Sequence, residues 1–207
     1  QKKIICNSRW DITSELVSKI NSCDAPPPVF LSGSAIGYYG NQGDKLVTEE
    51  TPPHNEFTHE LCAKWETIAQ SVDQAKTRVV TLRTGVVLTE KGGALGKMAL
   101  PFKLGAGGTL GSGSQYLAWI HLQDMVRAIS FLLENSTCSG AFNLTAPEPV
   151  TNKEFSKALA KSLNRPCLFN VPGFVMKVAM GESSTMILEG QRAIPQKLTT
   201  AGFSFEF

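Results

Sequence analysis

The sequence predicts an α/β fold, in which helices cover both faces of a doubly wound, mostly parallel sheet. Two observations carry this prediction. Helical and strand-like segments alternate along the chain, which is typical of β-α-β units joined by right-handed crossovers. The strand-like segments are short apolar runs without polar alternation, as expected for parallel strands that are buried on both faces.

The first half of the chain supplies two predicted helices and two predicted strands. Apolar residues at helical spacing indicate a helix over residues 9–22, and the apolar run 29–31 begins a strand. A polar loop is expected over residues 41–55, and residues 79–88 predict the next strand. The second helix, over residues 57–75, rests on apolar residues that step by four, four, three and four: Phe57, Leu61, Trp65, Ile68 and Val72.

In the second half of the chain the predicted helices and strands are shorter and alternate less regularly. Residues 119–121 predict a short strand and residues 125–133 a helix. Thr151 and Glu154 have the spacing of a capping box, which predicts that a helix begins there. From residue 166 onward we expect short helices and turns in a small α+β lobe, and residues 205–207 resemble a strand.

Composition excludes several classes of protein. The chain of 207 residues is 42% apolar and 18% charged, which is ordinary for a globular domain. A net charge of +2, with acidic and basic residues interspersed, speaks against nucleic acid or an anionic membrane as a partner. No apolar run approaches the roughly 20 residues of a membrane span. Five scattered cysteines without a C-x-x-C motif indicate reduced thiols in a cytoplasmic protein and no metal site.

One glycine-rich stretch resembles a dinucleotide-binding turn but does not match its motif. Residues 105–111 read Gly-Ala-Gly-Gly-Thr-Leu-Gly, so Leu110 takes the place of the third glycine in G-x-G-x-x-G, and no apolar strand leads into them. We therefore predict a mobile loop there. The chain also opens on Gln1 rather than on methionine. We expect the sheet to be incomplete at its N-terminus, with the phosphate-binding turn outside this chain.

A hydroxyl-rich segment follows the first predicted strand. It contains Ser32, Gly33 and Ser34, which are followed by Tyr38 and Tyr39. Ligands of open α/β sheets bind at the carboxyl ends of the strands, so these side chains are candidates for a ligand site. From the residues alone, a strand that ends in an ordinary polar turn is the favoured interpretation.

Several segments resemble a known class. Residues 34–40 resemble the serine segment of extended short-chain dehydrogenase/reductases, and residues 119–128 resemble the strand-to-helix segment "I-H-V-D-D" of that class. Residues 142–144 with 149–151 resemble its later strand. More closely, the chain resembles the YfcH-like epimerase family along almost its whole length. The segments that carry this resemblance are 33–40, 61–66, 82–88, 111–116, 119–121 and 189–195.

The resemblance implies a Rossmann-type domain that binds NADP or NAD, with NADP favoured. This domain would occupy residues 1–150, with substrate-lobe segments within 89–120, and residues 151–207 would form mainly the small C-terminal lobe. By the same resemblance Ser34 would hydrogen-bond the reacting group, and Lys64 would hold the nicotinamide ribose. The residues implied to contact the cofactor are Ser32, Gly33, Lys64, Arg83, Thr84, Gly85, Val86 and Val87.

The chain departs from the class at its catalytic pair. The class uses Tyr-x-x-x-Lys on a helix, where one turn brings the phenol and the ammonium together. Here Lys64 is preceded four residues earlier by Glu60, whose reference pKa lies about six units below that of tyrosine. Three alternatives remain open: Tyr38 or Tyr39 supplies the phenol, His59 transfers the proton, or the domain binds a dinucleotide without this chemistry.

Three further residues are predicted to meet the substrate. Trp119 and His121 belong to the segment that resembles the class, although a lone histidine is more often structural. Arg192 could grip a pyrophosphate with its planar fork, or could simply be solvated. If the substrate is a sugar nucleotide, all three should converge on a cleft that faces Ser34.

These observations together favour an NAD(P)-dependent oxidoreductase or isomerase, similar to epimerases and dehydratases, that acts on a small polar substrate such as a nucleotide sugar. The alternative is a non-catalytic dinucleotide-binding or interaction protein that lacks the Tyr-x-x-x-Lys pair. The expected partners are a small-molecule substrate and, as a possibility, a second copy of the chain; neither nucleic acid nor a membrane is expected.

Overall fold

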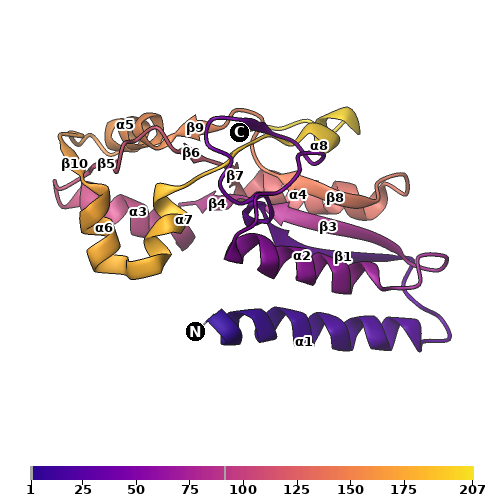
Figure 1. The fold of residues 1–207 in the computed structure, drawn as a ribbon. Helices are drawn as coiled ribbons and strands as arrows, with labels where there is room; N and C mark the ends of the chain where they lie inside the picture. The colour runs from indigo at the N-terminus through magenta and orange to yellow at the C-terminus, as the bar shows by residue number, and fades with distance from the viewer. Residues whose placement is uncertain (1, 91) are drawn as a thin grey trace.

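A three-stranded parallel sheet forms the centre of the molecule. The computed structural model describes residues 2–90 and 92–207, except for the side chains of residues 179, 180, 182, 183, 186 and 187. The strands β1 (Val29–Ala35), β3 (Arg78–Thr84) and β8 (Gly140–Leu144) lie in the order β1-β3-β8. Both neighbouring pairs are parallel, so their carboxyl ends meet at one edge of the sheet (Figure 1).

Helices cover both faces of this sheet. The helices α1 (Lys2–Asn21) and α2 (Phe57–Gln70) pack on one face, where Val17 and Ala69 bury Val79 of β3. On the other face α4 (Leu122–Glu134) packs Ala128 and Leu132 against β3 and β8. Burial of these apolar side chains is the main force that holds the layers together. The predicted α/β class is therefore confirmed.

A smaller lobe lies beyond the carboxyl edge of the sheet (Figure 1). Its helices are α3 (Gly93–Lys103), α5 (Asn152–Ser162), α6 (Gly173–Met180), the 3-10 helix η2 (Gly181–Ser184) and α7 (Thr185–Leu188). Its strands β5 (Gly108–Leu110) and β10 (Phe169–Val171) pair with each other. The predicted capping box is present, because the side chains of Thr151 and Glu154 satisfy each other's backbone amides at the start of α5.

Short elements join the two parts. They form three two-stranded pairs: β4 (Val86–Thr89) with β7 (Trp119–His121), β6 (Tyr116–Leu117) with β9 (Val150–Thr151), and β2 (Leu46–Val47) with β11 (Arg192–Ala193). The 3-10 helix η1 (Ile36–Tyr39) continues directly from β1, and α8 (Gln196–Thr200) follows β11. None of the described helices is long and apolar enough to cross a membrane.

The structure corrects several predicted bounds. Helix α1 begins seven residues earlier than expected, α2 ends at Gln70 rather than at residue 75, and residues 205–207 form no strand. The predicted strand over 79–88 is interrupted at Gly85. There the Gly85 amide donates to Leu144 O of β8, whereas the next amide donates to Ala118 O beside β7. A Cβ at Gly85 would lie 2.7 Å from that Ala118 oxygen, so the close approach requires glycine.

The glycine-rich stretch is also more ordered than predicted. Residues 105–111 contain the strand β5 rather than only a mobile loop, and the helix α3 precedes them. Ala99 and Phe102 of α3 are buried against Leu159 and Ala160 of α5. This packing stabilises a helix that carries two glycines and Pro101, which local propensity alone would not form.

Candidate functional site

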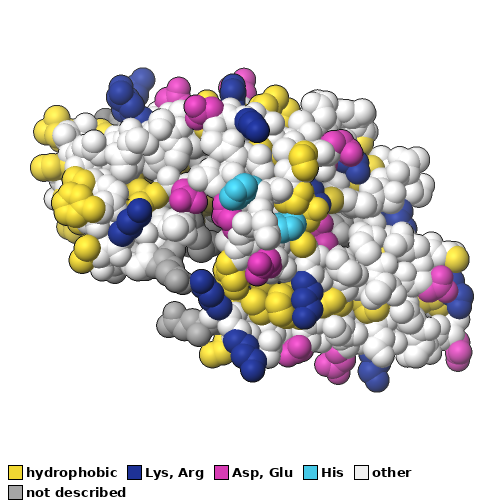
Figure 2. Space-filling view, in the orientation of Figure 1, with side chains coloured by type: hydrophobic (Ala, Val, Ile, Leu, Met, Phe, Trp, Pro, Cys, Tyr) yellow, Lys and Arg dark blue, Asp and Glu magenta, His cyan; other side chains and the backbone are white. Residues whose placement is uncertain are grey.

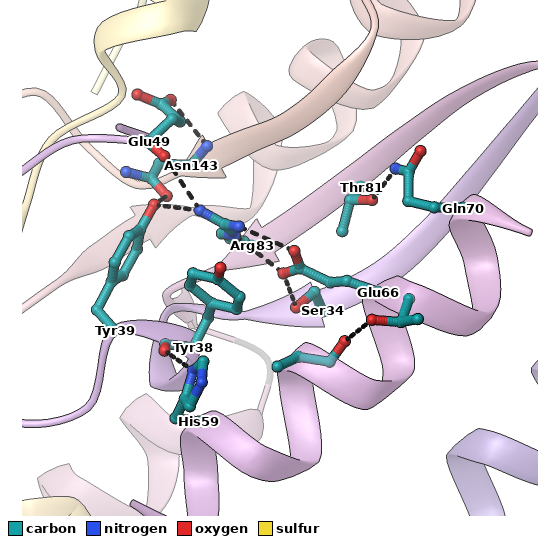
Figure 3. A network of polar contacts seen from close by, with 12 residues as sticks. Ser34, Tyr38, Tyr39, Glu49, His59, Glu66, Gln70, Thr81, Arg83 and Asn143 are labelled. Atoms are coloured by element: carbon teal, nitrogen blue, oxygen red, sulfur yellow. Dashed lines mark hydrogen bonds and ion pairs between the residues drawn. The ribbon is translucent and has the colours of Figure 1, made fainter. Parts of the chain in front are cut away.

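A cluster of polar side chains lies where the three parallel strands end (Figure 3). Ser34, Arg83 and Asn143 stand at matching register positions on β1, β3 and β8, so they form one row across the sheet. Tyr39 reaches the row from η1, Glu66 from α2 and Glu49 from the loop before α2. We call these residues the strand-end cluster: Ser34, Tyr39, Glu49, Glu66, Arg83 and Asn143.

An ion pair between Arg83 and Glu66 is the centre of the cluster. Arg83 Nε and Nη2 donate to the two Glu66 oxygens at 2.9 and 2.8 Å, which is a bidentate pair. Ser34 Oγ donates to the same carboxylate at 2.7 Å. Burial by itself would lower the pKa of Arg83, but hydrogen bonds and charge from Glu66 and Tyr39 raise that pKa above its ordinary value. The guanidinium therefore remains charged although it is enclosed.

Tyr39 is an interior member of the cluster. Its hydroxyl donates to Asn143 Oδ1 at 2.7 Å and accepts from Arg83 Nη1 at 2.9 Å, and the residue is fully buried. Burial raises the pKa of its phenol to about 12, against a smaller lowering effect of Arg83. The Tyr39 hydroxyl is thus enclosed within the sheet edge, and the acid-base role named for Tyr39 stays a prediction.

Tyr38 and His59 lie at the outer side of the cluster. The Tyr38 ring packs on the Arg83 guanidinium, whose central carbon is 3.5 Å from the ring centroid. Since the Tyr38 carbonyl can only accept, His59 Nδ1, 2.8 Å away, carries the hydrogen. The Nε2 atom of a neutral His59 then has a free lone pair. Tyr38 also borders a shallow cavity of about 410 Å³ that is lined by Ala63, Glu66, Thr67, Gln70 and Ser71.

Helix α2 turns a different face to the cluster from the one that the sequence suggested. Lys64 is exposed and holds its ammonium 4.0 Å from the centroid of the Trp10 ring on α1. The face that meets Ser34 carries Cys62 and Glu66, one helical turn apart. Burial raises the pKa of the Cys62 thiol, while contacts with Ala35 and Ser34 offset part of that shift. The structure thus places the Lys64 ammonium on Trp10, and its role at the cofactor site stays a prediction.

The residues implied to hold a cofactor are only partly available. Ser32 is buried and donates weakly to its neighbour's carbonyl, and Gly33 is exposed beside the Trp65 ring. The amides of Gly85 and Val86 already donate to backbone carbonyls. Thr84 Oγ1 donates to Leu82 O, and Val87 packs against the core. Arg83 belongs to the cluster through its side chain rather than through its backbone.

Each of the three residues predicted to meet a substrate has a different environment, and their convergence on one cleft stays a prediction. His121 Nδ1 accepts from Gln123 N at the start of α4, and its ring lies 3.9 Å from the Phe207 ring. The exposed Arg192 holds its guanidinium 5.2 Å from the ring centroid of Tyr116. Trp119 Nε1 is buried without a hydrogen-bond partner among the described residues, which leaves one donor unsatisfied.

Comparisons with known proteins agree on one family. Residues 2–145 match the NAD dependent epimerase/dehydratase family, and residues 171–207 match a domain of unknown function, DUF1731. The curated epimerase family protein YfhF of Bacillus subtilis is 40% identical over all of this chain, which covers 68% of that protein. A Mycobacterium bovis relative, Mb2239, is 42% identical over 99% of the chain, which spans 67% of it.

Solved structures give the same result. The crystal structure of the human epimerase family protein SDR39U1 with NADPH has a TM-score of 0.95 and 34% identity over all of this chain, which covers 70% of the human chain. A nucleoside-diphosphate sugar epimerase from Corynebacterium glutamicum has a TM-score of 0.83 and 28% identity, over 40% of its own length. The narrower YfcH-like group remains a prediction. The chain belongs to the NAD dependent epimerase/dehydratase family.

Proposed function

We propose that this protein binds NADP in preference to NAD and acts as an epimerase- or dehydratase-like oxidoreductase or isomerase on a small polar substrate of the nucleotide-sugar class. The cofactor preference is supported by the NADPH in the structure of SDR39U1. The site is supported by the position of the strand-end cluster, because open α/β sheets bind ligands at the carboxyl ends of their strands.

The described residues fit one end of such a cofactor better than the other. Around Tyr38 and His59 they offer a phenol, an imidazole and a carbonyl, which suit a ribose and a reacting hydroxyl. The cluster offers no free cation for the phosphates, since Arg83 is committed to Glu66 and Tyr39. When bound, the dinucleotide would accept or donate the hydride, and the protein's own groups would orient the substrate and move a proton.

The observation that carries the catalytic proposal is the hydrogen bond from His59 Nδ1 to the Tyr38 carbonyl. This bond fixes the tautomer and leaves Nε2 as the atom that takes or returns a proton. The Tyr38 hydroxyl, on a ring that packs against the Arg83 guanidinium, would hold the substrate oxygen. Of the candidates that the sequence offered for proton transfer, these two lie at the outer side of the cluster, whereas Tyr39 is enclosed.

A second function is favoured by a different observation. The face of α2 that meets Ser34 carries a thiol and a paired carboxylate, and Lys64 lies over Trp10 instead. A domain without a phenol and an ammonium on that face could bind a dinucleotide and carry out no redox step. The second candidate is therefore a non-catalytic dinucleotide-binding protein.

One experiment separates the two functions. NADPH and NADP binding are measured by calorimetry. After addition of UDP-glucose and related sugar nucleotides, conversion of the sugar is followed by NMR, because an epimerase or dehydratase restores its cofactor in each turnover, and the nicotinamide absorbance is followed for a net redox step. In an active protein His59→Asn should lower turnover about 100-fold or more, the usual size of a lost acid-base group, without changing NADPH affinity. His54→Asn is the matched control, because His54 is an exposed histidine that bonds Glu56 outside the cluster.

The outcomes are distinct. NADPH binding without any conversion of the sugar nucleotides and without any absorbance change across the panel would favour the non-catalytic candidate. Turnover that is equal in His59→Asn and in the wild type would remove the proton-transfer role from His59. Absence of NADPH and NADP binding in a protein that also carries a phosphate-binding turn would contradict both functions.

A further inference from the structure

One end of the lobe exposes large apolar side chains. Figure 2 shows hydrophobic side chains at the outline of the molecule, over the region where Figure 1 places β10 and α6. Val178 of α6 is 86% exposed, and Leu168, beside β10, is 78% exposed. A surface of this kind is unusual for a protein that meets only water. We call these residues the lobe patch: Leu100, Leu104, Leu168, Phe169, Phe174 and Val178.

Chain connectivity keeps the members of the lobe patch near one another. Leu100 lies in the last turn of α3, and Leu104 follows that turn, four residues before β5 begins. β5 pairs with β10, whose first residue is Phe169. Helix α6 begins directly after β10, and Phe174 and Val178 stand one turn apart on it, so they share a side of the helix.

The two segments that contribute the lobe patch carry charge of a single sign. These segments, residues 93–110 and 164–181, contain four cationic side chains and no aspartate or glutamate. All four cations are exposed, and they form no ion pair among the residues that the structure describes: Lys97, Lys103, Arg165 and Lys177. The net charge of the whole chain is small, so it does not reveal that positive charge is concentrated in these two segments.

We propose that the lobe patch docks this protein peripherally onto an anionic lipid surface. Exposed aliphatic and aromatic side chains would enter the boundary between headgroups and acyl chains, and the four cations would pair with lipid phosphates. Charge complementarity selects this partner, because the patch offers cations and no acidic group. The proposal is independent of the catalytic function.

Vesicle co-sedimentation tests the proposal on the intact chain. Binding to vesicles of phosphatidylcholine and phosphatidylglycerol is compared with binding to phosphatidylcholine alone. We expect binding only to the anionic vesicles, and its loss at high salt. The double variant Phe174→Ser and Val178→Ser should weaken binding about tenfold or more, because two apolar side chains no longer leave water. Lys177→Gln should weaken it about fivefold.

A matched control uses another exposed apolar surface. Ile12 and Leu16 of α1 are 60% and 48% exposed, so the double variant Ile12→Ser and Leu16→Ser removes comparable apolar area away from the lobe patch. Its vesicle binding should equal that of the wild type, and circular dichroism verifies that each variant is folded.

Four results would overturn the proposal. They are no binding to anionic vesicles, equal binding to neutral and anionic vesicles, equal losses in the α1 control and the patch variant, and a patch variant that binds vesicles normally but dissociates a dimer seen by analytical ultracentrifugation. The last result would make the lobe patch an interface between copies of the chain.

Discussion

The two faces of helix α2 differ in what their side chains do. On the face toward α1, Lys64 lies exposed over Trp10, where the attraction between an ammonium and a ring is weak because water screens it. On the face toward the sheet, Glu66 makes a bidentate ion pair with Arg83 and accepts from Ser34 within a nearly closed interior. The comparison teaches that two residues on one helix can have different environments. Lys64, at the spacing of the class's Tyr-x-x-x-Lys motif, contacts Trp10 of α1 here, whereas Glu66, which lies outside that motif, binds the side chains at the strand ends.

The largest expected effect comes from breaking the buried ion pair. Arg83→Ala should lower the free energy of unfolding by about 3–5 kcal/mol, because Glu66 would remain as an uncompensated buried charge. Urea denaturation measures this loss. The double variant Arg83→Met and Glu66→Leu should recover more than half of it, since it removes both charges. A double variant as unstable as Arg83→Ala would show that packing rather than charge dominates.

A smaller effect is expected from the buried phenol. Tyr39→Phe should cost about 1–3 kcal/mol at neutral pH, because Asn143 and Arg83 each lose a partner. The wild type should show a further dependence on pH. The pKa of the Tyr39 phenol is about 12 in the folded chain and 10.0 in the unfolded chain. The neutral phenol therefore stabilises the fold fully below pH 10.

This contribution is lost as pH rises through 12, and two pKa units set an upper limit of about 2.7 kcal/mol. Denaturation curves at pH 9 and at pH 11.5 should therefore differ more for the wild type than for Tyr39→Phe. Equal differences in the two proteins would mean that Tyr39 ionises as easily in the folded chain as in the unfolded chain.

The smallest effect should follow from Lys64→Ala. We expect it to change the free energy of unfolding by no more than about 0.5–1 kcal/mol, the size of an exposed contact between a cation and a ring. It should leave NADPH affinity unchanged. Lys64→Arg, which keeps the charge over Trp10, serves as the control. A loss of NADPH affinity in the alanine variant alone would restore Lys64 to the cofactor site.

The fold could be predicted from the sequence where the spacing of apolar residues matches the buried face of a helix or strand. The apolar steps of residues 57–72 and the apolar run 29–31 report faces that are buried whatever the rest of the chain does. Helix α3 could not be predicted this way, because glycine and Pro101 oppose a helix locally and its stability comes from packing on α5. The end of α2 was misplaced because Val72 continues the apolar spacing beyond the last helical turn.

The candidate site was less accessible to sequence reasoning. Ser34 and Tyr38 stand out because they follow a strand. The direction in which Lys64 points depends on α1, whose Trp10 lies more than fifty residues away in the sequence. No local sequence pattern predicts that Glu66 pairs with Arg83 or that Glu49 pairs with Asn143. The register of the parallel strands aligns Arg83 with Asn143, and α2 and the loop before it bring the two carboxylates to them.

The carboxylate of Glu49 also has a kinetic consequence. It accepts hydrogen bonds from the amides of Asn143 and Lys197, which are 94 and 148 positions away along the chain. Each contact closes a long loop, and the chain loses the conformational entropy of that loop before the hydrogen bond can form. The bonds of Glu49 should therefore form late in folding, after the local helices. Substitutions at Glu49 should accelerate unfolding and leave the folding rate almost unchanged.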